Sequence, residues 1–335
     1  MSLFKKLAQQ PQSPAAPPHQ YAYKTRFALL GTVGAGKSTI ASLMMLTTQT
    51  LSADYHDFYC RVLEGSSSVY QDISNLRDGH FPEKTEAHQQ IATEAGLLME
   101  WERRLGGIKI GTKSLQIPLV DLAGEDVQMF DAKYTKNIGA LGNVVHSAVE
   151  NLKQYVRQCE GYVIVVKASR AKGIFPEGGQ LESEDDKQLS KDPDVNLVRM
   201  LNHVIDYKRQ HRQAIHGIAV VVTAWDLLLP YAQNIGLDIF RHDQNDMRDF
   251  MDVFFPSVSQ AIKGSRLQNV RYFPMYVQLE YDANGNPKKW KDGSPKIQRK
   301  QSFGTQRQQI RDMRKPSYNE QGCIDLIEYL HGFAK

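Results

Sequence analysis

A glycine-rich stretch between an apolar strand and an apolar helix carries the clearest chemical signal in this chain. Residues 25–46 read TRFALLGTVGAGKSTIASLMML, and residues 31–38 match the pattern G-x-x-x-x-G-K-[ST]. Glycines let the backbone wrap closely round an anion with its amides pointing inward. The N-terminus of the following helix presents its positive dipole end to the same anion. The pattern predicts a phosphate-binding loop, whose contacting residues are Gly31, Val33, Gly34, Ala35, Gly36, Lys37, Ser38 and Thr39.

Lys37 and Ser38 supply the most important side chains of this loop. In this pattern the lysine reaches the β- and γ-phosphates of a nucleotide, and the hydroxyl that follows it ligates Mg²⁺. We therefore expect Lys37 to be a binding and catalytic residue, Ser38 to be a metal ligand, and Thr39 to help hold the α-phosphate. A chance turn is the alternative, which the flanking strand and helix disfavour.

A second, acidic loop follows a later apolar strand. Residues 114–126 read SLQIPLVDLAGED, so Asp121 ends the strand and Gly124 comes three residues later. A carboxylate in that position can hold Mg²⁺, usually through water, and the glycine amide can bind a γ-phosphate. The pattern D-x-x-G is short. Behind a phosphate-binding loop, however, it indicates a metal ligand at Asp121 and a reacting phosphate near Gly124.

A third loop, Thr223-Ala224-Trp225-Asp226, follows an apolar strand that includes residues 220–222. Ligands of open α/β sheets bind outside the carboxyl ends of the strands, where all three loops are expected. Thr223 and Asp226 are therefore candidate ligand contacts. The ordinary alternative for Asp226 is the N-cap of a helix that begins in the sequence DLLLPYA.

The elements that position these loops follow from the alternation of strands and helices between residues 25 and 226. This alternation predicts an α/β fold with a doubly wound, mostly parallel sheet and helices on both faces. Residues 1–24 are expected to form a flexible, Pro-rich tail. Residues 25–335 are expected to form a single domain, with insertions near 50–94, 170–194 and 281–317.

Local patterns predict several individual elements. Val69, Ile73 and Leu76 form an apolar stripe at helical spacing. Residues 95–120 are expected to form two strands joined by a Gly-Gly turn, and a later helix is expected to end near Pro256.

Together the three loops resemble those of the Ras-like, translation-factor-related (TRAFAC-class) P-loop GTPases, of which the chain would be an atypical member with large insertions. The resemblance covers roughly residues 25–280 and the final helix. It implies a small-GTPase-like P-loop NTPase fold, GTP/GDP and Mg²⁺ as cofactors, and an enzyme that hydrolyses GTP as a molecular switch.

The resemblance also assigns roles near the reacting phosphate. The family's Thr before the second strand binds Mg²⁺, and Thr85 is the best match, with Thr93 as its rival. The residue after the D-x-x-G glycine often positions the attacking water, which makes Glu125 a catalytic candidate in place of the usual Gln. The alternatives are a helix or strand cap for Thr85, and for Glu125 a solvated loop acid or a first-turn acid favoured by the dipole of the helix that follows.

For the base, the resemblance implies the motif [NT]-K-x-D. Its Asp accepts hydrogen bonds from guanine N1–H and the 2-amino group, which adenine lacks. Thr223 and Asp226 fit the first and last positions, whereas Ala224 replaces the lysine that covers one face of the base. Trp225 lies beside that gap, one residue out of step. No copy of the family's last base-contacting motif is recognisable, and Tyr276, Val277 and Gln278 occupy about its place.

Three functions remain open from the sequence: a GTP-hydrolysing switch, a P-loop ATPase or phosphotransferase, and a non-hydrolysing nucleotide-binding scaffold. The first implies guanine nucleotide and a protein effector or regulator as partners. The basic segment 282–316 would contact an acidic partner or a membrane surface, with a solvated loop as the alternative.

Composition bears on the partners and the location of the protein. The net charge is +4 over 335 residues, which disfavours nucleic acid as a partner of the whole chain. The three cysteines lack metal-type spacing, and no apolar run reaches the length of a membrane span. A cytoplasmic location is therefore expected, with peripheral attachment to a membrane or to a larger complex as a variant of it.

Overall fold

The computed structural model describes most of the elements that the sequence predicts. The residues that it describes are 25–32, 34–54, 58–63, 67–82, 96–118, 154, 156–171, 174, 193–231, 236, 243–265, 267, 269–302 and 313–335.

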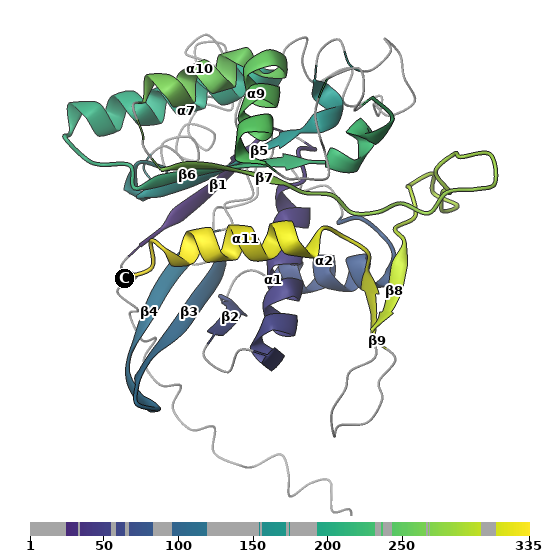
Figure 1. The fold of residues 1–335 in the computed structure, drawn as a ribbon, viewed down its shortest axis with the longest axis horizontal. Helices are drawn as coiled ribbons and strands as arrows, with labels where there is room; N and C mark the ends of the chain where they lie inside the picture. The colour runs from purple at the N-terminus through teal and green to yellow at the C-terminus, as the bar shows by residue number, and fades with distance from the viewer. Residues whose placement is uncertain are drawn as a thin grey trace, which may run out of the picture.

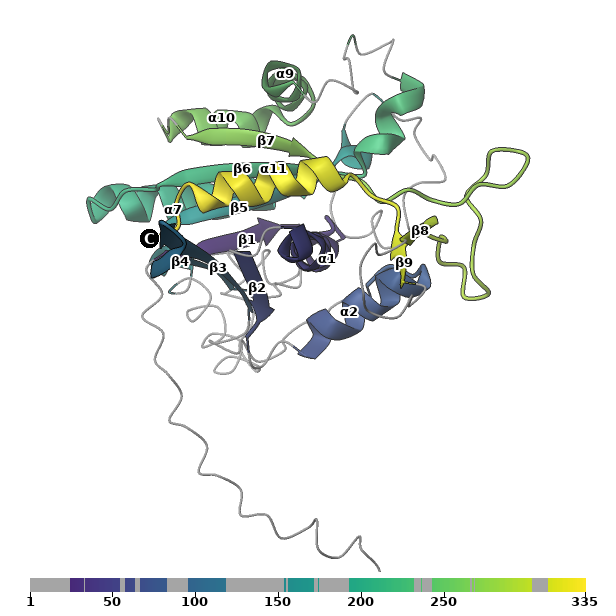
Figure 2. The ribbon, with the colours of Figure 1, turned by 60° about the horizontal axis from the view of Figure 1, so that its bottom comes forward.

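Four parallel strands form the centre of the molecule. They are β1 (Phe27–Gly31), β5 (Gly161–Lys167), β6 (Gly217–Thr223) and β7 (Val270–Pro274), in the order β1-β5-β6-β7. Figure 2 shows β7, β6, β5 and β1 one below the other. The inner strands β5 and β6 are almost wholly apolar and buried, as is typical of a parallel sheet covered on both faces.

A separate three-stranded antiparallel sheet lies beside the start of β1. It consists of β2 (Phe58–Val62), β3 (Gly96–Leu105) and β4 (Ile108–Pro118), in the order β2-β3-β4. The Gln116 amide of β4 donates to the Thr25 carbonyl at 3.0 Å, next to β1. The predicted hairpin is confirmed, and Gly106 and Gly107 form its turn with φ of 59° and 83°, which glycine adopts without strain.

Three helices cover one face of the sheet: α1 (Lys37–Asp54), α2 (Ser67–Asp78) and α11 (Glu320–His331). The predicted stripe of Val69, Ile73 and Leu76 is confirmed, because all three side chains are buried in this layer. Phe27 and Leu29 point from β1 into the same core.

The opposite face is covered by α7 (Pro193–Gln210), α9 (Gln244–Phe254) and α10 (Pro256–Gly264). The predicted helix end near Pro256 is confirmed, since α9 stops just before this residue and α10 begins with it. Figure 1 shows the two helical layers above and below the sheet. The fold is therefore α/β, with a four-stranded parallel sheet between helices, compatible with a doubly wound arrangement.

The segment after β7 is folded back on α2 where it is described. Its backbone forms nested turns up to β8 (Arg299–Ser302), which pairs with β9 (Met313–Pro316). The Trp290 indole stacks on His80 with ring centroids 4.1 Å apart and donates to the Gly79 carbonyl at 3.2 Å. The described part of this basic segment thus differs from a solvated loop, because Trp290 fixes it to the end of α2.

Among the residues that the structure describes, no helix has the length and apolar character needed to cross a membrane.

Candidate functional site

The phosphate-binding loop predicted from the sequence lies between β1 and α1. Gly34 and Gly36 have φ of 63° and 95°, in the left-handed region that favours glycine. A Cβ atom added to Gly36 would lie 3.3 Å from Cγ2 of Thr223. Gly36 is therefore required both for its backbone conformation and for the close approach of the loop to the end of β6.

Lys37 is the first residue of α1, and its side chain folds back over the loop. Its Nζ donates to the carbonyls of Gly31 and Thr32 at 3.0 and 3.2 Å, and the residue is only 8% exposed. Ser38 and Thr39 follow in the first turn and are half-buried. The ammonium and the helix N-terminus thus place positive charge at one end of the loop.

Thr223 joins the loop to the central strands. Its hydroxyl lies 2.7 Å from the Ala35 carbonyl and 3.2 Å from the Val166 carbonyl, as a donor shared between the two. Sequence reasoning placed Thr223 among the ligand contacts, whereas the structure directs its hydroxyl to the backbone of the phosphate-binding loop. The bond fixes the carboxyl end of β6 against that loop.

Asp226 lies in the first turn of a 3-10 helix, η4 (Trp225–Tyr231). Its carboxylate accepts hydrogen bonds from its own amide and from that of Leu227, which lower its pKa, but burial outweighs them and raises the pKa to about 6. The two backbone hydrogen bonds are those of a helix cap, so the capping alternative accounts for part of what Asp226 does. A simple surface cap would not be desolvated in this way, so the carboxylate is better suited to receive buried donors.

Trp225, which lies beside the missing lysine in the sequence, is not placed to cover a base. The Trp225 side chain is only 2% exposed and packs edge-on against Phe250 in the core, with ring centroids 5.0 Å apart. The Ala224 backbone has φ of 53°, which turns the chain sharply between the strand and η4. Consecutive residues therefore diverge, with the indole in the core and Asp226 at the sheet edge.

The loop after β7 lies beside Asp226. The Trp225 amide donates to the Met275 carbonyl at 3.1 Å, and the Met275 amide donates to the Val222 carbonyl at 2.8 Å. Burial raises the pKa values of Tyr276 and Tyr281, and the negative charge of Asp226 raises them further. Sequence reasoning left this last loop unassigned, although Tyr276 lies only two residues after the end of β7.

Arg170 is a site residue that sequence reasoning missed. It ends a short 3-10 helix, η3 (Ala168–Arg170), directly after β5, and its guanidinium Nη1 donates to Oγ1 of Thr32 in the phosphate-binding loop. The sequence signal that could have identified Arg170 is its position directly after β5, the strand that pairs with β1. Arg170 therefore adds a cationic contact to the loop from the side of β5.

The structure brings together two of the three predicted loops, residues 31–38 and 223–226, at the carboxyl ends of β1 and β6. The other predicted residues, Val33, Thr85, Asp121, Gly124 and Glu125, lie outside the described residues. Within the described ranges, no group of three or more His, Cys, Asp or Glu side chains is placed to hold a metal ion.

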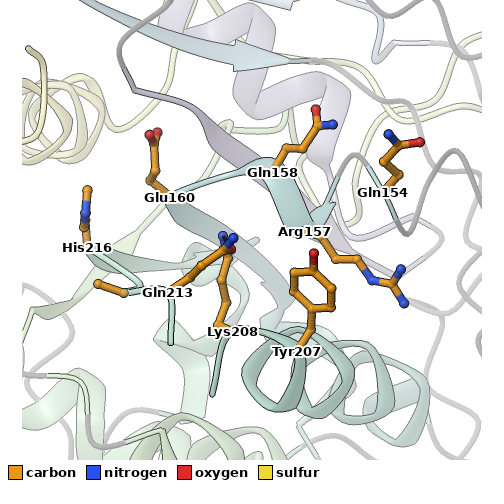
Figure 3. Close-up of a pocket in the computed structure, with 9 residues that line it drawn as sticks. Gln154, Arg157, Gln158, Glu160, Tyr207, Lys208, Gln213 and His216 are labelled. Atoms are coloured by element: carbon orange, nitrogen blue, oxygen red, sulfur yellow. Dashed lines mark hydrogen bonds between the residues drawn. The ribbon is translucent and has the colours of Figure 1, made fainter. Parts of the chain in front are cut away.

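A polar cavity of about 570 Å³ lies at the other end of the strands (Figure 3). Glu160 and His216 in its lining directly precede β5 and β6, so they mark the amino ends of these strands. Lys208 also lines it, from the last turn of α7, where the helix dipole favours a cation, although burial lowers its pKa. The cavity is therefore separate from the phosphate-binding loop.

A scan against protein-family models gives no match for this chain, and a search of curated proteins gives no similar sequence.

Proposed function

We propose that this protein is a Mg²⁺-dependent GTP-binding and GTP-hydrolysing switch. The observation that carries the proposal is the 2.7 Å hydrogen bond from the Thr223 hydroxyl to the Ala35 carbonyl. It joins the phosphate-binding loop to the loop that ends in Asp226, so that groups suited to a phosphate and to a guanine base lie at one sheet edge.

The residues of the phosphate-binding loop fit a nucleotide triphosphate. A side chain at Gly36 would crowd Thr223, Lys37 carries a charge over the loop, and the amides of the first turn of α1 point toward it. The Ser38 hydroxyl, in the same turn, is proposed as the Mg²⁺ ligand. When bound, Mg²⁺ would supply positive charge that offsets the negative charge developing on the phosphate. GTP would supply the phosphate bond that is cleaved.

Asp226 is proposed to select guanine. Its ionised carboxylate can accept one hydrogen bond from N1–H and one from the 2-amino group, whereas adenine would leave these acceptors unpaired. Because Ala224 cannot cover the base as a lysine would, we propose that Tyr276 or Tyr281 contributes apolar surface there. Both phenols are close enough to Asp226 for its charge to raise their pKa values.

Four residues outside the described ranges complete the proposed mechanism. Asp121 and Thr85 would help hold Mg²⁺, Gly124 would offer its amide to the γ-phosphate, and Glu125 would orient the attacking water. The Thr85 and Gly124 segments would be held while the triphosphate is intact and released after hydrolysis, which is how such switches signal to an effector.

The finer fold assignment, a small-GTPase-like P-loop NTPase, is part of the same proposal. It is supported by the β3–β4 hairpin, which is bridged to the residue before β1 through Gln116 and which precedes Asp121 in the sequence. An antiparallel edge in this position is what the resemblance to Ras-like GTPases implies.

Single-turnover hydrolysis of GTP and ATP by the full chain tests the proposal. We expect Mg²⁺-dependent GTP cleavage that Lys37→Ala abolishes and that Lys291→Ala, an exposed lysine far along the chain, leaves unchanged. Preferential ATP cleavage would instead favour an ATPase or phosphotransferase. Tight GTP binding without cleavage would favour a nucleotide-binding scaffold.

A further inference from the structure

The tip of the β3–β4 hairpin exposes three large aliphatic side chains. Leu105 and Ile108 are each 72% exposed and Ile110 is 55% exposed. Figure 1 shows the hairpin projecting at the lower left of the molecule. Single exposed apolar residues are common on protein surfaces, whereas several at one projecting point indicate an interaction site.

The hairpin tip has two chemically different faces. Leu105 pairs with Ile108 across the two strands, and Arg103 shares their side of the ladder because strand side chains alternate. Glu102 and Arg104 lie on the other side, joined by an ion pair of 2.9 Å. The tip is therefore amphipathic, with the aliphatic pair on one face and an ion-pair cluster on the other.

The aliphatic face continues a buried surface of the protein. Trp101, two residues before Arg103 on the same side of β3, stacks on Phe58 and on His331 with ring centroids 5.0 and 4.8 Å apart. Beyond Trp101 the strand leaves this packing, and residues 103–110 are all exposed. The apolar face thus extends past the part of the fold that covers it.

The charges around the tip are mostly positive. Residues 102–113 contain four cations (Arg103, Arg104, Lys109 and Lys113) and one acid, Glu102. The Glu102 side chain is only 13% exposed, whereas its partners Arg104 and Lys109 are 41% and 55% exposed. The solvent therefore meets the cations more than the acid.

We propose that this hairpin tip inserts into an anionic lipid surface. Leu105, Ile108 and Ile110 enter the boundary between headgroups and acyl chains, and the surrounding cations contact lipid phosphates. A projecting two-residue turn offers much less area than the roughly 800 Å² per partner of a stable protein interface. A bilayer accepts such a convex tip, and the positive charge matches its anionic headgroups.

Vesicle flotation of the full chain tests this proposal. We expect binding to phosphatidylcholine vesicles that contain about one-third phosphatidylserine, weaker binding without phosphatidylserine, and loss of binding in high salt. Replacing Leu105, Ile108 and Ile110 together by Ser should lower the partition coefficient about tenfold. Arg103→Gln should lower it about fivefold, since one cation near an anionic surface contributes about 1 kcal/mol.

Val253→Ser is the matched control, because Val253 is 67% exposed on α9, away from the hairpin. It should leave partitioning unchanged. All substituted side chains are exposed, so thermal unfolding should show that the variants remain folded. A fluorophore on Ile108→Cys should shift to the blue when anionic vesicles are added.

Two outcomes would overturn the proposal. The first is vesicle binding that the triple variant leaves intact. The second is an absence of vesicle binding together with a concentration-dependent dimer that the triple variant abolishes, which would assign the tip to contact with a second copy of the chain. Neither outcome depends on whether the protein binds GTP.

Discussion

Replacing Asp226 by Asn separates a base-reading carboxylate from an ordinary helix cap. Burial raises the pKa of Asp226 to about 6, from an ordinary value of 3.8. This difference corresponds to about 3 kcal/mol of preference for the protonated acid in the folded state. The cost to the fold is therefore absent below the pKa of the unfolded chain, grows as pH rises between the two pKa values, and is complete above about pH 6.

The direction of the pH dependence follows from these two pKa values. Between them the folded state binds more protons than the unfolded state, so the contribution of Asp226 to the unfolding free energy falls as pH rises from about 4 to 7. Asn has the same shape and retains an oxygen that accepts the backbone amides, but it carries no charge. We expect Asp226→Asn to be more stable than wild type by about 1–3 kcal/mol at pH 7.5, and to lose that advantage near pH 4.

Urea unfolding of nucleotide-free protein at several pH values measures this effect. Asp243→Asn is the matched control, because Asp243 is an exposed N-cap of α9 that accepts from the Asn245 amide at 2.6 Å. Its replacement should leave the unfolding free energy at pH 7.5 close to that of wild type, since Asn is also a good N-cap.

Nucleotide affinity supplies the second half of the experiment. Asp226→Asn should weaken GTP binding on the order of 100-fold, because charge-assisted hydrogen bonds to the base are lost. It should strengthen binding of xanthosine triphosphate, whose 2-carbonyl can accept from the Asn amide. Wild-type GTP affinity should also weaken as pH falls below about 6, where Asp226 becomes protonated. Unchanged GTP affinity in the variant, or equal wild-type affinity for ATP, would refute the base-reading role.

Two of three further predictions concern the candidate site, and the third concerns the contact that holds the segment after β7 on α2. Thr223→Val should weaken GTP binding at least about tenfold through loss of its hydrogen bond to Ala35, whereas Thr223→Ser should stay close to wild type by calorimetry. Gly36→Ala should lose nucleotide binding, with about 1–3 kcal/mol of backbone strain at φ 95°, and retained binding would contradict the described loop conformation. Trp290→Ala should lower stability by about 2 kcal/mol and increase amide exchange at Gly79, whose carbonyl loses its indole donor, while Trp290→Phe should recover the stacking part alone.

Local sequence patterns were sufficient for the framework of this fold. The positions of β1, β5 and β6 follow from apolar runs, and the β3–β4 hairpin follows from a Gly-Gly turn between alternating strands. The break at Pro256 follows from the missing amide of proline. Each of these signals depends on residues that are close to each other in the sequence. The sequence alone is therefore enough to predict these elements.

The side-chain directions at the site could not be predicted in the same way. The sequence left the direction of the Trp225 side chain open. It lies in the core, because the turn at Ala224 and the packing of Phe250 decide which neighbour faces inward. Arg170 was missed, because its partner Thr32 is 138 residues away and no motif links the two.

The sequence by itself determined a glycine-rich loop between a strand and a helix and the order of elements that follows, because backbone propensity and hydrophobic period are local properties. Only the tertiary structure decided what meets at the loop. The Thr223–Ala35 bond spans 188 residues, and the Trp290–Gly79 bond spans 211. Parallel strand pairing and the packing of the whole core determine which distant residues meet. The free energy that such a contact contributes depends on every element that brings its two ends together.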